Sequence, residues 1–323
     1  MMLGSNPQGK GRIIPADALA VAEAATVLRG GGIVALPTET VYGLAADASN
    51  AGAVAKIYAA KGRPDFNPLI VHVPDMEAAE AIAHFDERAA ALADRFWPGA
   101  LTLVLPMKAD AKIAPAVTAG LPTIALRCPS HPVMQALLLA SGLVVAAPSA
   151  NRSGGISPTI AAHVADSLGD AAPLIIDAGA CRAGLESTIV AVRPDGWQIL
   201  RPGPITAAQI EAVLGKKPLD DNNGGIEARV EAPGQLASHY APTKPLRLNA
   251  DTAKSGEWHI GFGAISGDEN LSGRGNPAEA AANLFAALHR ADASDRLAIA
   301  VAPVVNDGIG VAINDRLQRA ASR

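Results

Sequence analysis

Short polar segments stand directly after two apolar stretches that are typical of buried strands. Pro37–Leu44, rich in hydroxyl groups and carrying a carboxylate, follows the stretch 33–36, and Ala146–Gly154 begins at the end of the stretch 143–147. In open α/β sheets, ligands bind just beyond the ends of strands. Hydroxyl and backbone N–H groups there can surround an oxyanion. The alternatives are ordinary turns, the second of them leading into a helix N-cap at Ser157.

A lysine and an arginine two residues apart follow the predicted helix 51–61. Lys61 shares a helical face with apolar side chains, so its ammonium group points toward the buried side and requires an anionic partner. Arg63 lies in a loop fixed by a glycine and a proline, where its guanidinium offers a rigid fork for phosphate. The alternative is that both cations only complement the helix dipole. His72, on the next strand, taken alone indicates a hydrogen-bonded structural histidine.

Further polar residues stand at other strand ends. Arg127 ends the predicted strand 123–127, Ser187 begins another strand, and Arg201 closes a third. No one of them is specific. Together they predict one anion-rich pocket for phosphate and carboxylate ligands.

Two sequence motifs resemble nucleotide-binding loops but lack their context. Gly4–Lys10 nearly matches a P-loop, yet Gly11 stands where Ser or Thr would bind magnesium, and no strand precedes the segment. Gly261 and Gly263 follow a strand, but the third glycine of a dinucleotide fingerprint comes one residue late. The seven histidines show no metal-binding spacing, and no G-x-S-x-G elbow occurs. The familiar catalytic signatures are therefore absent from the sequence.

Composition indicates a globular protein. Of 323 residues, 49% are hydrophobic and 18% charged, with a net charge of −4, a mean hydropathy of +0.20 and a pI near 6.0. No apolar run reaches the roughly 18 residues that span a bilayer. Two cysteines form neither a disulfide framework nor a zinc site alone. We expect a cytoplasmic protein with no membrane contact, and the acidic balance argues against a nucleic-acid clamp over the whole surface, though not against a local basic groove.

Helical and strand patterns alternate irregularly over the first 214 residues. Several strands follow one another directly, which predicts a twisted mixed sheet rather than a regular βαβ array. The predicted helices cover 16–29, 51–61, 77–95 as one long helix, 132–140, 159–168 and 206–214. The predicted strands cover 33–36, 69–73, 100–105, 123–127, 143–147, 173–177, 187–192 and 197–201.

Four regions follow from these patterns. We predict a mobile tail over 1–13, a larger α/β domain over 14–210, a linker over 211–245 and a small Rossmann-like α/β domain over 246–323. The linker is rich in Pro, Gly and Asp, and it is long for a passive spacer. The last domain carries predicted strands 245–248, 257–263 and 296–303 and helices 277–291 and 308–321.

Seven segments occur in the order and spacing of the YrdC-like family: PTETVYGL, KGRPDFNPLIVHV, FWPGALTLVL, APSANRSG, SPT, GLESTIV and ILRPG. The later SHYAP segment and the ending GVAINDRLQRAA resemble the long form of the family, the L-threonylcarbamoyladenylate synthases. The resemblance covers residues 14–321. The family's K-x-R and S-x-N signature, which marks catalytic residues, stands here as Lys61, Arg63, Ser149 and Asn151.

The resemblance implies that L-threonine, bicarbonate and ATP give threonylcarbamoyl-AMP, diphosphate and water, the first step of threonylcarbamoyladenosine modification of tRNA. By position, the implied threonine site is Thr40, His72, Arg127, Ala147 through its backbone, and Ser187. The implied ATP site is Arg63, Asn67, Thr123, Ser149, Ser157, Arg201 and Tyr240. Mg²⁺ would arrive with ATP, without dedicated protein ligands. The implied partners are a downstream tRNA threonylcarbamoyl transferase and a direct contact with tRNA or double-stranded RNA.

Two questions and two rival functions remain at this point. The linker over 211–245 is either a passive tether or, as we expect, a lid whose Tyr240 touches the nucleotide. The base that deprotonates the amine is either His72 or a substrate carboxylate. A hydrogenase-maturation type of carbamoyl transfer would require paired-cysteine zinc fingers, which this chain lacks. A double-stranded RNA binder would show steeply salt-dependent affinity.

Overall fold

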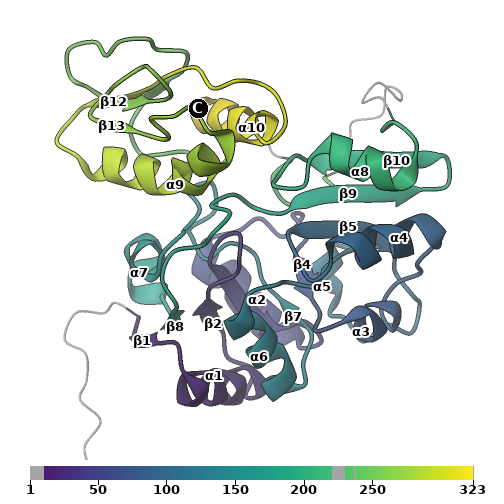
Figure 1. Cartoon of the computed structure of the whole chain (residues 1–323). Helices are drawn as coiled ribbons and strands as arrows, with labels where there is room; N and C mark the ends of the chain where they lie inside the picture. Colours follow the sequence, from purple (N-terminus) through teal and green to yellow (C-terminus); the bar gives the residue numbers. More distant parts are fainter. Residues whose placement is uncertain (1–10, 220–229, 236–237, 323) are drawn as a thin grey trace, which may run out of the picture.

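The computed structural model describes residues 11–219, 230–235 and 238–322. Most of the predicted tail 1–13, including the P-loop-like segment Gly4–Lys10, lies outside these residues. So do 220–229 and 236–237 of the predicted linker. The described residues form two α/β units, and Figure 1 shows them one above the other.

The first unit is built on a ten-stranded mixed sheet, which confirms the predicted fold class. Parallel pairs such as β4–β6 and β5–β9 stand beside antiparallel pairs such as β5–β6 and β9–β10. In spatial order the strands are β1 (Ile13–Pro15), β8 (Leu174–Asp177), β2 (Val34–Leu36), β3 (Gly43–Asp47), β7 (Val145–Ala146), β4 (Ile70–His72), β6 (Thr123–Arg127), β5 (Leu101–Pro106), β9 (Thr188–Arg193) and β10 (Gly196–Arg201).

Helices around this sheet begin at polar caps. The side chains of Asp17, Asn50 and Thr206 accept hydrogen bonds from the first turns of α1, α2 and α8, which satisfies backbone N–H groups that lack a helical partner. The helices of the first unit are α1 (Ala18–Arg29), α2 (Ala51–Lys61), α3 (Met76–Glu80), α4 (Glu87–Phe96), α5 (Pro115–Thr118), α6 (Pro132–Ser141), α7 (Ala161–Leu168), the 3₁₀ turn Gly169–Ala171 and α8 (Ala207–Leu214).

The prediction of one long helix over 77–95 is wrong, because two helices occupy this stretch. α3 ends at Glu80, and α4 begins at Glu87. Between them Ala83 pairs with the segment that follows β5, and Asp86 caps α4 by accepting a hydrogen bond from Ala89 N at 2.8 Å. Apolar periodicity runs across the break, so the capping aspartate was the signal that a new helix begins.

The second unit is a four-stranded parallel sheet with two helices. Its strand order is β11 (Leu246–Arg247), β14 (Ala298–Val301), β12 (Glu257–Gly261) and β13 (Glu269–Asn270). Its helices are α9 (Pro277–Ala293) and α10 (Gly310–Ala321). All three strand pairs are parallel, in agreement with the expected small α/β domain.

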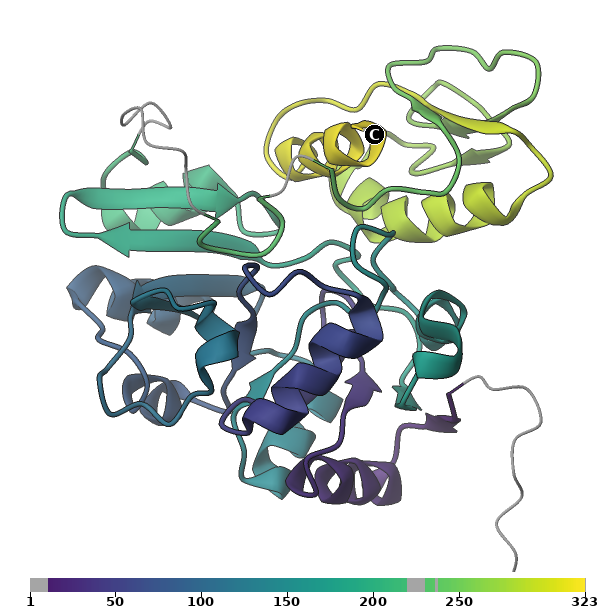
Figure 2. The same ribbon diagram turned by 180° about the vertical axis from the view of Figure 1, so that it is seen from behind.

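An apolar interface joins the two units. Val41, Leu185 and Tyr240 belong to the same buried cluster as the α9 residues Leu284 and Phe285. Figures 1 and 2 show α9 above α7 and α10 beside the β9–β10 hairpin. The second unit is thus held against the segments that follow β2 and precede β9, where site residues were predicted.

Within the described residues, no helix has both the length and the apolar character needed to cross a membrane.

The sheet core should respond far more strongly to truncation than the helical surface. Leu126 on β6 is fully buried, so Leu126→Ala is expected to lower the free energy of unfolding by about 2–5 kcal/mol through lost burial and a cavity. Leu139 on α6 is 70% exposed, and Leu139→Ala serves as the control. Urea unfolding of both variants makes the comparison, and equal losses would contradict the assigned core.

Candidate active site

One small cavity collects most of the predicted site residues. It lies where strand ends of the first unit meet the linker. Nine predicted residues line it: Thr40, Arg63, His72, Arg127, Ala147, Ser149, Ser187, Arg201 and Tyr240. The other lining residues are Val41, Ile70, Pro148, Glu186, Pro233, Gly234 and His239.

Strand register brings these side chains together from distant parts of the sequence. His72 and Arg127 are paired in the parallel strands β4 and β6, and each is the last residue of its strand. Ala147 follows β7, the other neighbour of β4. Thr40 lies in the turn between β2 and β3, and Arg201 ends β10. The expectation that strand ends converge on one pocket is met by these residues.

Arg127 holds a carboxylate and a hydroxyl at one end of the cavity. One guanidinium nitrogen lies 2.6 Å from Glu39 Oε1, and another donates to Thr40 Oγ1 at 2.9 Å. Burial raises the pKa of Glu39, but Arg127 outweighs it and the pKa is lowered overall. Glu39 is therefore ionised at neutral pH. Glu39 was not among the predicted site residues, although it lies within the PTETVYGL segment.

His72 is a neutral imidazole in this structure. It is 1% exposed, and its Nδ1 has no partner among the described residues. Burial, with the nearby Arg127, lowers the pKa of His72 to about 3. Such a side chain is too weak a base to take a proton from an ammonium group. Of the two bases left open by the sequence, His72 is thereby disfavoured, and its Nδ1 remains available to hydrogen-bond a ligand.

Arg63 and Arg201 bring two further buried guanidinium groups to the cavity. Arg63 donates to Asn67 Oδ1 at 2.7 Å and to the Pro68 carbonyl at 2.8 Å. Arg201 donates to the Ser187 carbonyl at 2.9 Å and to Ser187 Oγ at 3.2 Å. Burial lowers the pKa of Arg63 to about 10, so the group keeps its charge at neutral pH. The cavity therefore presents several fixed cations to a ligand.

Lys61 lies behind the cavity wall. Its Nζ donates to the carbonyl groups of Ser149, at 2.6 Å, and of Asn151. Asn151 in turn donates from Nδ2 to Gly155 O at 2.8 Å. Burial and the nearby Arg63 lower the pKa of Lys61 well below its usual value. In this structure Lys61 and Asn151 hold the loop that presents Ser149.

The remaining predicted residues also do not line the cavity. Asn67 orients Arg63, and its Nδ2 has no partner among the described residues. Ser157 donates from Oγ to Glu186. Thr123 stands at the start of β6, four residues before Arg127, and pairs with Pro106.

Linker residues close one side of the cavity. Tyr240 is 1% exposed, its hydroxyl has no partner among the described residues, and its φ of 63° lies in the left-handed region. Gly234, with φ 88°, comes so close that a Cβ there would lie 2.7 Å from Tyr240 Oη. Ala241 N donates to Gly154 O at 2.8 Å, which ties the linker to the Ser149 loop.

Buried polar atoms without partners point to a ligand. Besides His72 Nδ1 and Tyr240 Oη, His239 Nδ1 is buried and unpartnered among the described residues. Native proteins satisfy nearly all buried polar groups, so three such atoms around one cavity indicate groups that a substrate completes. Glu186 and His239 were not predicted; the GLESTIV and SHYAP segments that carry them were the available signal.

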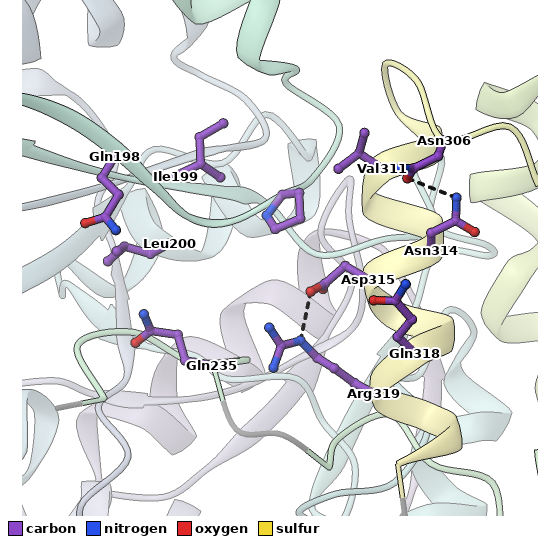
Figure 3. Close-up of a pocket in the computed structure, with 11 residues that line it drawn as sticks. Gln198, Ile199, Leu200, Gln235, Asn306, Val311, Asn314, Asp315, Gln318 and Arg319 are labelled. Carbon is purple, nitrogen blue, oxygen red and sulfur yellow. Dashed lines mark hydrogen bonds and ion pairs between the residues drawn. The ribbon is translucent and has the colours of Figure 1, made fainter. Parts of the chain in front are cut away.

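A second, wider cavity of about 450 Å³ lies between β10 and α10. Figure 3 shows Gln198, Ile199 and Leu200 on one side and α10 on the other, where Asp315 bonds Arg319. None of the predicted site residues lines it, and its charged side chains are already paired with each other. It offers no comparable set of buried cations.

Buried neutral histidines make stability fall in acid. An unfolded histidine has a pKa near 6.5, whereas burial lowers that of His72 to about 3. Between these values only the unfolded chain binds the proton, so stability declines as pH falls, by about 1.4 kcal/mol per pH unit for this histidine. Urea unfolding from pH 7 to pH 5 should show a shallower decline for His72→Gln, and the same decline as the parent for the exposed His84→Gln. Parallel curves for parent and His72→Gln would refute the assignment.

Two family models together match almost the entire chain. The Sua5, YciO and YrdC model, described as telomere recombination, matches residues 26–203. The threonylcarbamoyl-AMP synthase C-terminal domain matches residues 205–322.

Similar proteins cover the same length. A threonylcarbamoyl-AMP synthase of Bacillus subtilis is 43% identical over 93% of this chain and 92% of its own. One from Pyrococcus abyssi is 39% identical over 92% of this chain and 93% of its own. The crystal structure of P. abyssi Sua5 complexed with L-threonine superposes with a TM-score of 0.86 at 35% identity, covering 97% of both chains. The chain therefore belongs to the threonylcarbamoyl-AMP synthases of the Sua5, YciO and YrdC family, and it also carries the C-terminal domain of residues 205–322.

Proposed function

We propose that this protein joins L-threonine, bicarbonate and ATP into threonylcarbamoyl-AMP, with release of diphosphate and water, as the first step of tRNA threonylcarbamoyladenosine formation. The observation that carries the proposal is the convergence of Arg63, Arg127 and Arg201 on one cavity. A polyanionic nucleotide and a carboxylate-bearing amino acid are the ligands that such a cavity requires. The names of the relatives, and the threonine bound to the P. abyssi protein, support it.

Threonine fits the end of the cavity around Arg127. Its carboxylate can meet the Arg127 guanidinium, already oriented by Glu39 and Thr40. The neutral His72 can accept a hydrogen bond from the substrate. Ser187 and the Ala147 backbone complete this end of the proposed site.

ATP fits the end around Arg63, Arg201 and Tyr240. Ser149 joins this group at the cavity wall, and Lys61 with Asn151 keeps the Ser149 loop in place. Asn67, Ser157 and Thr123 belong to the proposed ATP site as well. Asn67 accepts a hydrogen bond from Arg63, and Ser157 donates one to Glu186.

The proposed chemistry needs alignment and charge stabilisation. The neutral threonine amine attacks bicarbonate, water leaves, and a carbamate oxygen then attacks the α-phosphorus in line while its bond to diphosphate breaks. Holding the reactants in place can contribute about 7–11 kcal/mol. Fixed guanidinium groups stabilise the charge on phosphoryl oxygens and on the leaving diphosphate. With His72 neutral, the amine proton passes to an oxygen of a substrate.

Magnesium in this proposal enters with the nucleotide. Among the described residues no group of three or more His, Cys, Asp and Glu side chains is arranged to hold a metal. Glu186, which lines the cavity, is paired with Arg316, and Glu39, which lies behind Arg127, is paired with that arginine. These residues fit an ion held by phosphate oxygens, where it would shield the phosphates from one another.

The linker acts as a lid in this proposal. The closed cavity encloses only about 40 Å³ of free space, whereas pockets for small ligands hold roughly 300–1,000 Å³. Pro233, Gly234, His239 and Tyr240 occupy part of its wall. The linker must therefore move away to admit ATP, and its return would exclude water from the labile carbamate.

The product is unstable, so its transfer to tRNA requires a second enzyme. The proposed partners include a downstream tRNA threonylcarbamoyl transferase and a direct contact with tRNA or double-stranded RNA. Cys128 and Cys181 are free and buried, which agrees with work in the reducing cytoplasm.

Diphosphate release tests the reaction. Release from ATP should require both L-threonine and bicarbonate, and Arg63→Ala or Lys61→Ala should slow it by about 100-fold or more, because a phosphate contact or the Ser149 loop is lost. Lys56→Ala, on the exposed side of the same helix, is the matched control. Release without threonine would indicate another carbamoyl acceptor. No release, together with salt-sensitive RNA binding, would favour an RNA-binding protein.

The lid should fail when Gly234 gains a side chain. Its Cβ would lie 2.7 Å from Tyr240 Oη and 2.8 Å from Arg201 Cδ, so closure over ATP is hindered and the KM for ATP is expected to rise about tenfold. Gly120→Ala matches the backbone strain, with φ 73°, but meets nothing within 4 Å. Steady-state kinetics compare the two, and equal KM values would argue for a passive tether.

A further inference from the structure

The second unit places a buried arginine between the two domains. Arg316 on α10 is fully buried, although it lies only one residue beyond Asp315, which reaches the wide cavity of Figure 3. Ala312, Ile313 and Leu317 of the same helix are buried as well, so Arg316 belongs to the face of α10 that is turned inward. A buried guanidinium requires several polar partners.

All three nitrogens of Arg316 are bonded. Nε donates to Glu186 Oε2 at 2.9 Å, and the two terminal nitrogens donate to Asp315 at 2.6 Å and to the Pro202 carbonyl at 2.9 Å. The guanidinium carbon also lies 5.1 Å from the ring centre of Tyr240. Three of these partners belong to the first domain or to the linker, and two of them, Glu186 and Tyr240, line the catalytic cavity.

The other oxygen of Glu186 accepts a hydrogen bond from Ser157 Oγ. Burial raises the pKa of Glu186, but Arg316 and Arg201 outweigh it and lower the pKa overall. An ionised Glu186 can only accept hydrogen bonds, so Ser157 must donate to it. Because Arg316 helps to keep Glu186 ionised, it also fixes the Ser157 hydroxyl as the donor of this hydrogen bond.

We infer that Arg316 is a positioning residue for ATP, through which the last helix of the second domain sets the geometry of a site in the first. One side of its guanidinium fixes Glu186 and hence Ser157, and its face holds the Tyr240 ring over the cavity. This inference rests on the proposed function, since it assigns a role toward the nucleotide end of the same site. In this inference Glu186 and Arg316 do not contact ATP themselves.

A purely structural role predicts a different outcome. If Arg316 only joined the domains, its loss would lower stability and leave the ATP affinity of the folded protein unchanged. If Arg316 positions Ser157 and Tyr240, its loss weakens ATP binding. Threonine binding is unaffected, because Arg316 does not contact the proposed threonine partners around Arg127.

Equilibrium binding of ATP to the full-length chain separates these roles. Arg316→Met should weaken ATP by about tenfold or more in isothermal titration calorimetry. L-Threonine affinity should stay within about twofold of the parent, a change too small to signal a lost hydrogen bond. Arg247→Met, which removes another arginine–glutamate pair of the second domain, serves as the control and should bind ATP like the parent.

A double variant guards against misfolding. Arg316→Met alone leaves the Glu186 carboxylate buried without its main partner. Glu186→Gln combined with Arg316→Met removes both charges of this ion pair and retains a side-chain oxygen that can accept from Ser157. The double variant should fold and recover part of the lost ATP affinity. Unchanged ATP affinity in Arg316→Met, equal weakening of threonine, or no recovery in a folded double variant would overturn the inference. Failure of the parent itself to bind ATP would overturn the proposed function, and the inference with it.

Discussion

Three guanidinium groups are buried around one cavity, and the surrounding structure offsets the cost of removing them from water. A buried charge persists only where it is paired and hydrogen-bonded. Arg127 has a carboxylate partner in Glu39, whereas Arg63 and Arg201 are bonded mainly to carbonyl groups. A carbonyl has only a partial negative charge and no flexibility of its own. The compensation therefore requires strand ends and loops held in fixed positions, and it leaves an excess of positive charge for the substrates.

Patterns in the sequence identified the mixed sheet, the second α/β unit and the polar residues at strand ends, because strand ends are visible as apolar runs followed by polar residues. The family resemblance, not periodicity, added Ala147, Tyr240 and the ligand role of His72. The break before α4 was missed, since apolar periodicity continues across it and only Asp86 marks the new start. The placement of Lys61 on the buried side was correct, but its partners proved to be carbonyl groups. Contacts between distant segments are not readable in this way. Arg316 bonds Glu186 across 130 residues, and periodicity shows that it faces inward without showing what it meets.

The two domains contribute to the cavity in different ways. The first supplies rigid strand ends, including those of β4 and β6, which hold the proposed threonine site. The second supplies no cavity-lining residue of its own sheet, but its helices α9 and α10 hold Tyr240 from two sides, through Phe285 and Arg316. A linker that crosses a pocket needs such a support on its outer side, because extended chain without regular structure has few hydrogen bonds to keep it in place.

The left-handed backbone of Tyr240 has a consequence for the proposed lid. Residues other than glycine lose about 1–3 kcal/mol in such conformations, and in the proposed lid this loss is recovered when the segment opens. This strain opposes closure of the proposed lid, and the contacts of Tyr240 with Phe285, Arg316 and the nucleotide must outweigh it. Once the nucleotide has reacted, part of the favourable contact energy is lost, whereas the strain remains. In the proposed lid, the strain therefore favours opening and release of the reactive product.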